Sequence, residues 1–224
     1  MNQVNYRCLS GSTLKVIALV SMTIDHLAYF VMAVSMGMQD VWTYGFLRGV
    51  GRIAFPVFAF LVVEGFHHTR NLHRYMVTLL ITAVISDVPW MLLGGVESHN
   101  VLFTLLLGLM AVAAADRLCK SLGTAIISTA FFSLVAAWLN VDYSWNGVCL
   151  MMVFYMFRDK PIFILPFGFP LLMQYGTVGT CLGLLVPLVY SGKRGFIHGG
   201  CMKYLFYLYY PLHLIVLWIF TTDG

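Results

Sequence analysis

The sequence predicts an all-α, polytopic helical membrane protein. Three observations predict this class: 60% of the 224 residues are hydrophobic, only 10% are charged, and the mean hydropathy is +0.86. Soluble domains carry about 25% charged residues, so this chain has fewer than half of the usual number. An aromatic content of 15% excludes a disordered protein, and the small, scattered net charge of +4 excludes a nucleic-acid partner.

Apolar segments follow one another along the whole chain. A hydrocarbon core ~30 Å thick needs roughly 17–25 apolar residues per helix. We count nine candidate spans, and only a few residues connect each to the next. We therefore expect one transmembrane domain, 1–224, with spans at 14–34, 45–65, 75–93, 100–117, 122–139, 145–157, 161–174, 176–191 and 201–221.

Basic residues predict the orientation of these spans, because Lys and Arg prefer cytoplasmic helix ends. With nine crossings and a cytoplasmic N-terminus, 11 of the 13 Lys and Arg lie at cytoplasmic ends and the C-terminus lies outside. Loss of one span would invert every later loop and spoil this agreement. The eleven are Arg7, Lys15, Arg70, Arg74, Arg117, Lys120, Arg158, Lys160, Lys193, Arg194 and Lys203.

Ionisable side chains inside the spans are the first candidates for function. Each costs ~2.5–3.5 kcal/mol at bilayer depth on insertion scales, and such groups usually face a cavity or the bundle interior. Each could also be a packing residue or a structural ion-pair partner, and an arginine near the outer surface could extend its side chain into water. The group comprises Asp25, His26, Arg48, Arg52, Asp87 and His213.

Helical spacing predicts how these groups pair. Asp25 and His26 are neighbours, so their side chains point about 100° apart on a helix. We therefore expect Asp25 to meet Arg48 or Arg52 on the second span. Asp87, at a depth similar to that of His26, is then the expected partner of the imidazole.

A second polar cluster lies at the cytoplasmic end of the second span, in the string EGFHHTRNLHRY. It is either an ordinary basic loop or a phosphate site, because arginine binds phosphate through paired hydrogen bonds. The His residues lack a compelling acidic or Cys partner, so we expect no metal. The cluster comprises Glu64, His67, His68, Thr69, Arg70, His73 and Arg74.

Two further observations complete the candidate set. Lys15 and His26 are eleven residues apart, or three helical turns, so they share one face of the first span. Asn100 and Thr104, one turn apart, form a neutral polar pair that faces the outer leaflet.

Several strings resemble the TraX family of polytopic membrane proteins. They are LKVIALVSMTIDH, GRIAFPVFAFLVVEGFHHTR, ISDVPW, HNVLFTLLLGL and YYPLHL, and the match runs from Leu14 to about Leu217. The family is named for a conjugation protein that acetylates the N-terminus of pilin. It is similar to other transmembrane acyltransferases, whose first span carries an Arg/Lys-x10-His signature. Lys15 and His26 fit that signature, whereas Arg48 and Arg52 depart from the spacing of the arginine pair in those enzymes.

This resemblance implies an acetyltransferase in the bacterial inner membrane. The donor would be cytoplasmic acetyl-CoA, and the acceptor an amine or hydroxyl of a pilin or peptide N-terminus, or of a glycan, at the outer face. His26 would act as general base, with Asp25, Arg52 and Asp87 completing the catalytic set. The residues expected to hold the donor are Lys15, Arg48, Glu64, His67, Thr69, Arg70 and Arg74. Those expected to contact the acceptor are Asn100, Thr104 and His213.

Two other functions stay open. A proton-coupled transporter would use Asp25, His26, Asp87 and His213 as a relay, although nine spans without an internal repeat do not make two related halves. A structural subunit of a secretion or conjugation apparatus would leave these charges without a purpose. A homodimer is also open: no GxxxG stripe dominates, but Gly176, Gly179 and Gly183 could pack closely against another helix.

Overall fold

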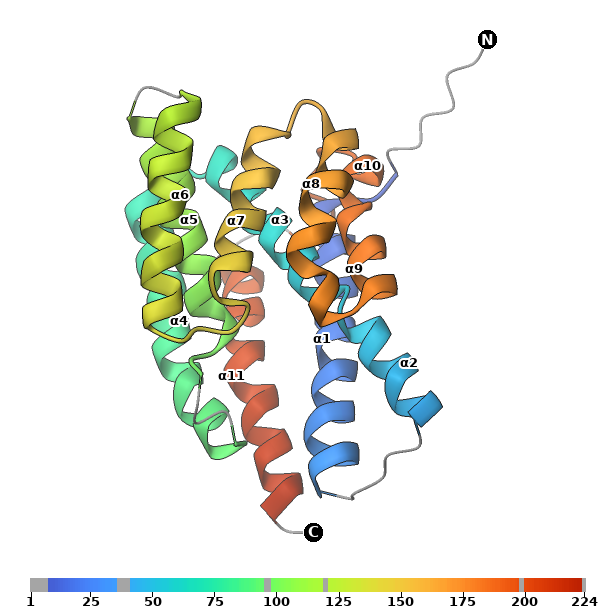
Figure 1. Ribbon diagram of the computed structural model, residues 1–224. Coiled ribbons are helices and arrows are strands. Elements are labelled where there is room, and N and C mark those ends of the chain that lie inside the picture. Colours follow the sequence, from blue (N-terminus) through green and yellow to red (C-terminus); the bar gives the residue numbers. More distant parts are fainter. Residues whose placement is uncertain (1–7, 36–40, 95–97, 119–120, 198–199, 223–224) are drawn as a thin grey trace.

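The computed structural model describes residues 8–35, 41–94, 98–118, 121–197 and 200–222, and these residues confirm the all-α class (Figure 1). Two basic residues used to predict the orientation, Arg7 and Lys120, lie outside the described ranges. The elements are α1 (Gly11–His26), the π-helix η1 (Leu27–Ser35), α2 (Val41–Gly51), α3 (Ala54–His68), α4 (Leu72–Leu92), α5 (Val101–Arg117), α6 (Leu122–Trp138), α7 (Ser144–Met156), η2 (Pro161–Phe163), α8 (Ile164–Leu172), η3 (Met173–Tyr175), α9 (Thr177–Leu184), α10 (Val186–Val189) and α11 (Gly200–Thr222).

Within the described residues, four helical segments are long and apolar enough to cross a membrane. They coincide with the first, second, third and ninth predicted spans, and they are Gly11–Met32, Trp42–His68, Leu72–Leu92 and Tyr204–Thr222. Shorter apolar helices of 10–17 residues make up much of the chain between the third and fourth of these segments. The chain is therefore a polytopic membrane protein.

From α3 to α7, successive helices run in opposite directions through the bundle (Figure 1). α1, α4 and α6 begin at the end of the bundle where α3, α5 and α7 finish, and α11 finishes at the opposite end. The predicted cytoplasmic ends of these helices therefore lie on one side of the molecule. α11 packs between α4 and the first span, so the last span of the chain contacts the first.

The first two spans are irregular where they face each other, although the sequence predicts both as continuous helices. α1 passes into η1, a π-helix of 9 residues, and the second span is interrupted at Arg52 and Ile53 between α2 and α3. An interruption inside a membrane frees carbonyl groups that other side chains must satisfy. The Ser21 hydroxyl does so from α1, with its Oγ 2.7 Å from the Val50 carbonyl oxygen and 3.1 Å from that of Gly51.

Glycines let α9 pack directly on the interrupted span. A Cβ atom on Gly179 would overlap the carbonyl oxygen of Gly49, and one on Gly183 would overlap a proline ring of α3. Gly176 has a φ of +137° and lies against the Arg52 side chain. These glycines, which the sequence suggests for a homodimer contact, therefore pack against the second span of the same chain.

We expect Gly179→Ala to lower the free energy of unfolding by about 1–3 kcal/mol, the usual cost of overpacking. The clash is with a backbone oxygen, which cannot rotate away, so α9 must shift from α2. Thermal unfolding in detergent measures the effect. Gly45→Ala in α2 is the matched control, because a Cβ there has no neighbour within 4 Å. Equal melting temperatures for Gly179→Ala and the unaltered protein would contradict the packing described here.

Candidate functional site

A cavity of about 1350 Å³ extends through the bundle along α1. Lys15 and His26 both line it, which confirms the shared face predicted from their spacing. At a rise of ~1.5 Å per residue, His26 lies ~16 Å further along the helix than Lys15. The cavity-lining residues of α1 and η1 are Gly11, Lys15, Leu19, Met22, Asp25, His26, Tyr29 and Phe30.

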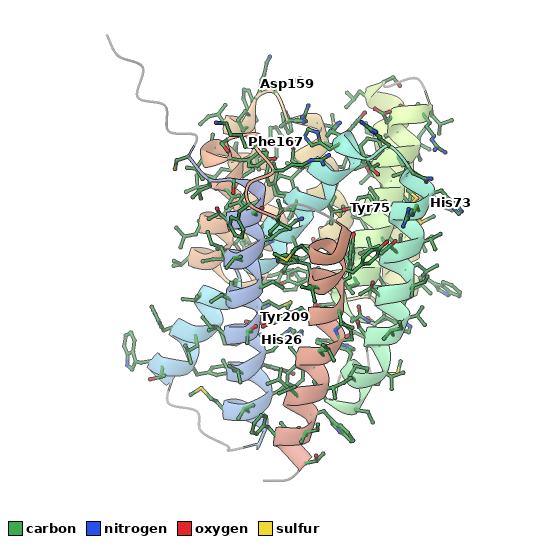
Figure 2. The ribbon with its side chains drawn as sticks, turned by 180° about the vertical axis from the view of Figure 1, so that it is seen from behind. His26, His73, Tyr75, Asp159, Phe167 and Tyr209 are labelled. Atoms are coloured by element: carbon green, nitrogen blue, oxygen red, sulfur yellow. The ribbon has the colours of Figure 1, made fainter. Side chains whose placement is uncertain are left out.

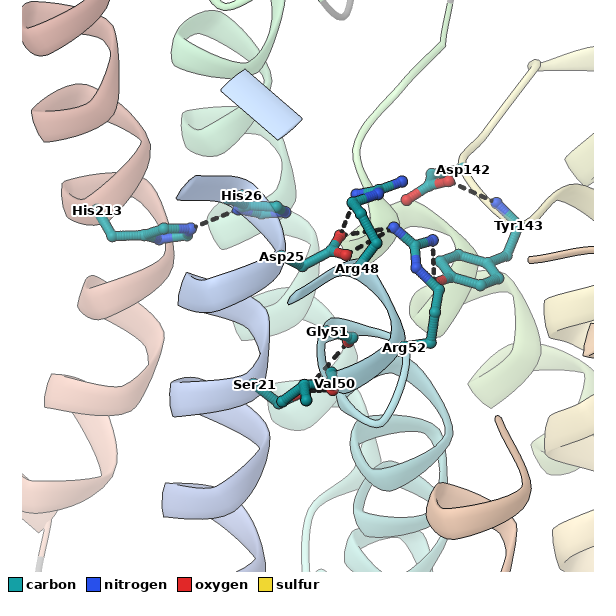
Figure 3. A network of polar contacts seen from close by, with 10 residues as sticks. All are labelled: Ser21, Asp25, His26, Arg48, Val50, Gly51, Arg52, Asp142, Tyr143 and His213. Carbon is teal, nitrogen blue, oxygen red and sulfur yellow. Dashed lines mark hydrogen bonds and ion pairs between the residues drawn. The ribbon is translucent and has the colours of Figure 1, made fainter. Parts of the chain in front are cut away.

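Asp25 lies between two guanidinium groups, as predicted (Figure 3). Arg52 Nη2 donates to both carboxylate oxygens at 2.8 and 2.7 Å, and Arg48 Nη1 lies 2.8 Å from Oδ2. Only 13% of the Asp25 side chain and 11% of the Arg52 side chain are exposed. Gly51 makes this approach possible, because a Cβ at that position would overlap the carboxylate. Two arginines thus share one acid, and the trio keeps one net positive charge.

Tyr143 joins this cluster from the loop between α6 and α7. Arg52 Nη1 donates to its hydroxyl at 3.2 Å, and its ring stacks on Phe55 with centroids 3.7 Å apart. The neighbouring Asp142 also lines the cavity. Burial raises the pKa of the Asp142 carboxyl to about 6, and the positive charge of Arg52 acts in the opposite direction.

His26 pairs with His213 of α11, so the predicted partner Asp87 is wrong. The Nδ1 of His26 lies 2.8 Å from the Nε2 of His213, and the two rings are inclined by only 10°. His213 is 8% exposed and is not among the residues that line the cavity. No described residue hydrogen bonds to Nε2 of His26, on the other side of the ring. His26 is labelled on α1 and Tyr209 on α11 in Figure 2, and the Tyr209 ring stacks on His213.

Asp87 binds the start of α5. His99 Nδ1 lies 2.7 Å from its Oδ2, and the Asn100 side-chain amide donates to its Oδ1 at 2.9 Å. The Asn100 side chain also caps α5 by accepting from the Leu102 amide. Thr104 is fully buried and donates to the Asp142 carbonyl oxygen. The structure therefore places Asp87, Asn100 and Thr104 in contacts between α4, α5 and the α6–α7 loop, outside the residues that line the cavity.

The other end of the cavity is a mouth lined by Lys15, Glu64, His68, Thr69, Arg70 and Arg194. The buried Glu64 accepts from Arg158 Nε at 2.8 Å and lies 3.3 Å from His68 Nε2. The hydrogen bond to this carboxylate raises the pKa of the Arg158 guanidinium. Arg70 and Arg194 are exposed at this end. The mouth is therefore cationic, in agreement with the prediction of a basic entrance.

Two arginines were not predicted to take part in the mouth: Arg194, which lines it, and Arg158, which binds Glu64 there. The segment before α11 folds back on the start of α1, where the Ser12 amide and hydroxyl donate to the Arg194 carbonyl oxygen at 2.9 and 2.7 Å. The basic pair Lys193–Arg194 in the sequence was the available signal, but spacing could not bring it beside Lys15.

Two residues predicted to bind the donor face elsewhere. His67 stacks on Tyr155 of α7, with ring centroids 5.7 Å apart, and Arg74 donates to the Tyr204 hydroxyl at 2.9 Å. Neither lines the cavity. Thr69 does line it, although its hydroxyl makes a local turn with Asn71.

The four groups of the transporter hypothesis do not form one relay. Asp25 is bound to two arginines, Asp87 is bound to His99 and Asn100, and only His26 and His213 touch each other. Among the described residues, no three His, Cys, Asp or Glu side chains are grouped as metal ligands.

Comparisons with known proteins identify a family and a curated relative for this chain. The profile of the family described as TraX protein matches residues 10–221. A protein of Dichelobacter nodosus, named probable fimbrial assembly protein FimC, serogroup H1, is 31% identical over 243 aligned positions, which cover 93% of this chain and 94% of that protein. No solved structure matches the chain. Since the family profile spans nearly all of the sequence, the chain belongs to the TraX protein family.

Proposed function

We propose that the protein is a membrane-embedded acetyltransferase, which moves an acetyl group from cytoplasmic acetyl-CoA to an amine or hydroxyl at the opposite face of the membrane. One observation carries this proposal: a single cavity joins a cationic mouth to His26, whose Nε2 has no hydrogen-bond partner among the described residues. Membership of the TraX family supports acyl transfer.

The proposed setting is the bacterial inner membrane. Nine crossings with a cytoplasmic N-terminus would put the mouth in the cytoplasm, where acetyl-CoA is made, and would put the C-terminus outside. The name of the D. nodosus relative, a fimbrial assembly protein, favours the N-terminus of a pilus subunit as acceptor. A glycan is the alternative acceptor.

The mouth suits the charged part of the donor. CoA carries phosphate groups, and Lys15, Arg70 and Arg194 present ammonium and guanidinium donors around one opening. The pantetheine arm would then follow the cavity-lining residues of α1 for ~16 Å, from Lys15 to His26. Small-molecule pockets are usually ~300–1,000 Å³ in volume, so a cavity of about 1350 Å³ leaves room for an acceptor beside the donor arm.

His26 is the proposed general base. Its Nε2 takes a proton from the acceptor N–H or O–H while the acceptor nitrogen or oxygen bonds to the thioester carbonyl carbon. The tetrahedral intermediate then breaks its C–S bond, and the leaving CoA sulfur takes the proton back from Nε2. Acetylated acceptor and CoA are the products, and His26 returns to its neutral form.

The two arginines are proposed to stabilise the oxygen that becomes negative in this intermediate. Arg48 and Arg52 line the cavity with one net positive charge, held in place by Asp25. Fixed positive charge in a site shielded from water lowers the barrier because it needs no reorganisation during the reaction. Asp25 acts here by holding the guanidinium groups.

We expect His26→Ala to lower acetyl transfer at least ~100-fold, the lower range for the loss of a general base. Thermal stabilisation by CoA should persist, because the mouth is intact. The measurement is mass spectrometry of a synthetic peptide with a free N-terminus, incubated with acetyl-CoA and purified protein. His73→Ala is the control, since His73 is exposed on α4 and does not line the cavity (Figure 2). Full transfer by His26→Ala would exclude the proposed base, and absence of any stabilisation of the unaltered protein by CoA would favour a carrier of other solutes.

Arg70→Ala should raise the apparent KM for acetyl-CoA about threefold to tenfold and leave kcat unchanged, as expected for the loss of one exposed charge-assisted contact. The increase should shrink at high salt, because ions screen exposed charges. Initial rates at varied acetyl-CoA concentration measure both constants. Arg117→Ala, at the exposed end of α5 and away from the cavity, is the matched control. The same KM in both variants would remove Arg70 from the donor site.

A further inference from the structure

A chain of hydrogen bonds runs from the cavity into the wall of the bundle. His26 Nδ1 lies 2.8 Å from His213 Nε2, and His213 Nδ1 lies 3.1 Å from the backbone carbonyl oxygen of Tyr209, one turn earlier in α11. The chain therefore ends on a group that cannot change its protonation state.

This ending determines where the hydrogens are. A carbonyl oxygen only accepts, so Nδ1 of His213 carries a hydrogen. In a neutral imidazole the other nitrogen holds the lone pair, and Nε2 of His213 therefore accepts from Nδ1 of His26. The lone pair of His26 is then on Nε2, the nitrogen without a partner among the described residues.

We propose that His213 is a positioning residue, which holds His26 in the tautomer whose basic nitrogen is Nε2. The use of that nitrogen as a base rests on the proposed function, whereas the tautomer itself does not. His213 does not line the cavity, so it would act through His26 and would not touch a substrate. A neighbour that fixes the tautomer of a histidine is a general device of acid–base sites.

Aromatic side chains hold both rings in this geometry. The Tyr209 ring stacks on His213, with ring centroids 5.3 Å apart and an inclination of 10°. The rings of Phe30 and Trp90 lie against His26, with centroids 5.8 and 6.0 Å from that of the imidazole. The Tyr209 hydroxyl lies 2.6 Å from Thr23 Oγ1 and so ties α11 to α1. When His26 accepts a proton at Nε2, its Nδ1–H bond to neutral His213 becomes charge-assisted and shortens.

The test reads the tautomer directly, by ¹⁵N chemical shifts of the ring nitrogens in full-length protein labelled at histidine. The His26 signals are assigned by their loss in His26→Ala. We expect unaltered protein to show a protonated Nδ1 and an unprotonated Nε2 at His26. His213→Leu should populate the other tautomer and lower kcat about 10–100-fold, as for other residues that orient a catalytic group, without changing the affinity for CoA. His213→Gln should restore most of the original His26 tautomer and most of kcat, because its amide can accept from His26 and donate to the Tyr209 carbonyl.

His99→Leu is the matched control, since it removes a hydrogen-bonded histidine that pairs with Asp87 and not with His26. It should leave the His26 signals unchanged. A protonated Nε2 in the unaltered protein, or an unchanged tautomer and kcat in His213→Leu, would overturn the inference. Should the unaltered protein transfer no acetyl group, the proposed function fails while the ring signals still decide the role of His213. Should His213→Leu not fold, the unaltered protein and His213→Gln decide it.

Discussion

One carboxylate between two guanidinium groups organises the centre of this membrane protein. Ionised groups are expensive in a low-dielectric interior, and removal of one partner from a buried ion pair typically costs ~3–5 kcal/mol. Asp25 and Arg52 are both largely buried, so neither tolerates separation. Their pairing fixes the first span against the second at one depth, and Arg48 and Arg52, one helical turn apart on the second span, both reach the acid.

The surrounding chain is adapted to this contact. Ser21 satisfies carbonyl groups at the interruption, Gly51 leaves space for the carboxylate, and the α6–α7 loop brings Tyr143 to Arg52. α9 covers the same region through glycines that allow backbone contact. The adjacent position on α1 points a different way, so His26 meets His213 of α11 and also lines the cavity. Neighbouring residues thus make separate contacts, Asp25 with two arginines of the second span and His26 with a histidine of the last span.

Much of this could be predicted from residue types and local spacing. Low charge and long apolar segments indicate a polytopic membrane protein, and four of the predicted spans are long enough in the structure to cross a bilayer. The helical repeat alone puts Lys15 and His26 on one face. Matched depth and opposite charge predict Asp25 with the arginines, because only two nearby groups on the next span could neutralise it. The TraX resemblance followed from the same local strings.

Partners distant in sequence were decided by tertiary structure alone. Depth gives the level of a side chain in the membrane but not the direction in which it points, so matched depth wrongly predicted Asp87 as the partner of His26. Because α11 packs between the first span and α4, His213 lies beside His26. Asp87 instead hydrogen bonds to His99 and Asn100. The position of Arg194 at the mouth likewise depends on backbone hydrogen bonds between the segment before α11 and the start of α1. Local sequence determines which groups must be buried with a partner, whereas the rotation and order of the packed helices determine which partner each one meets.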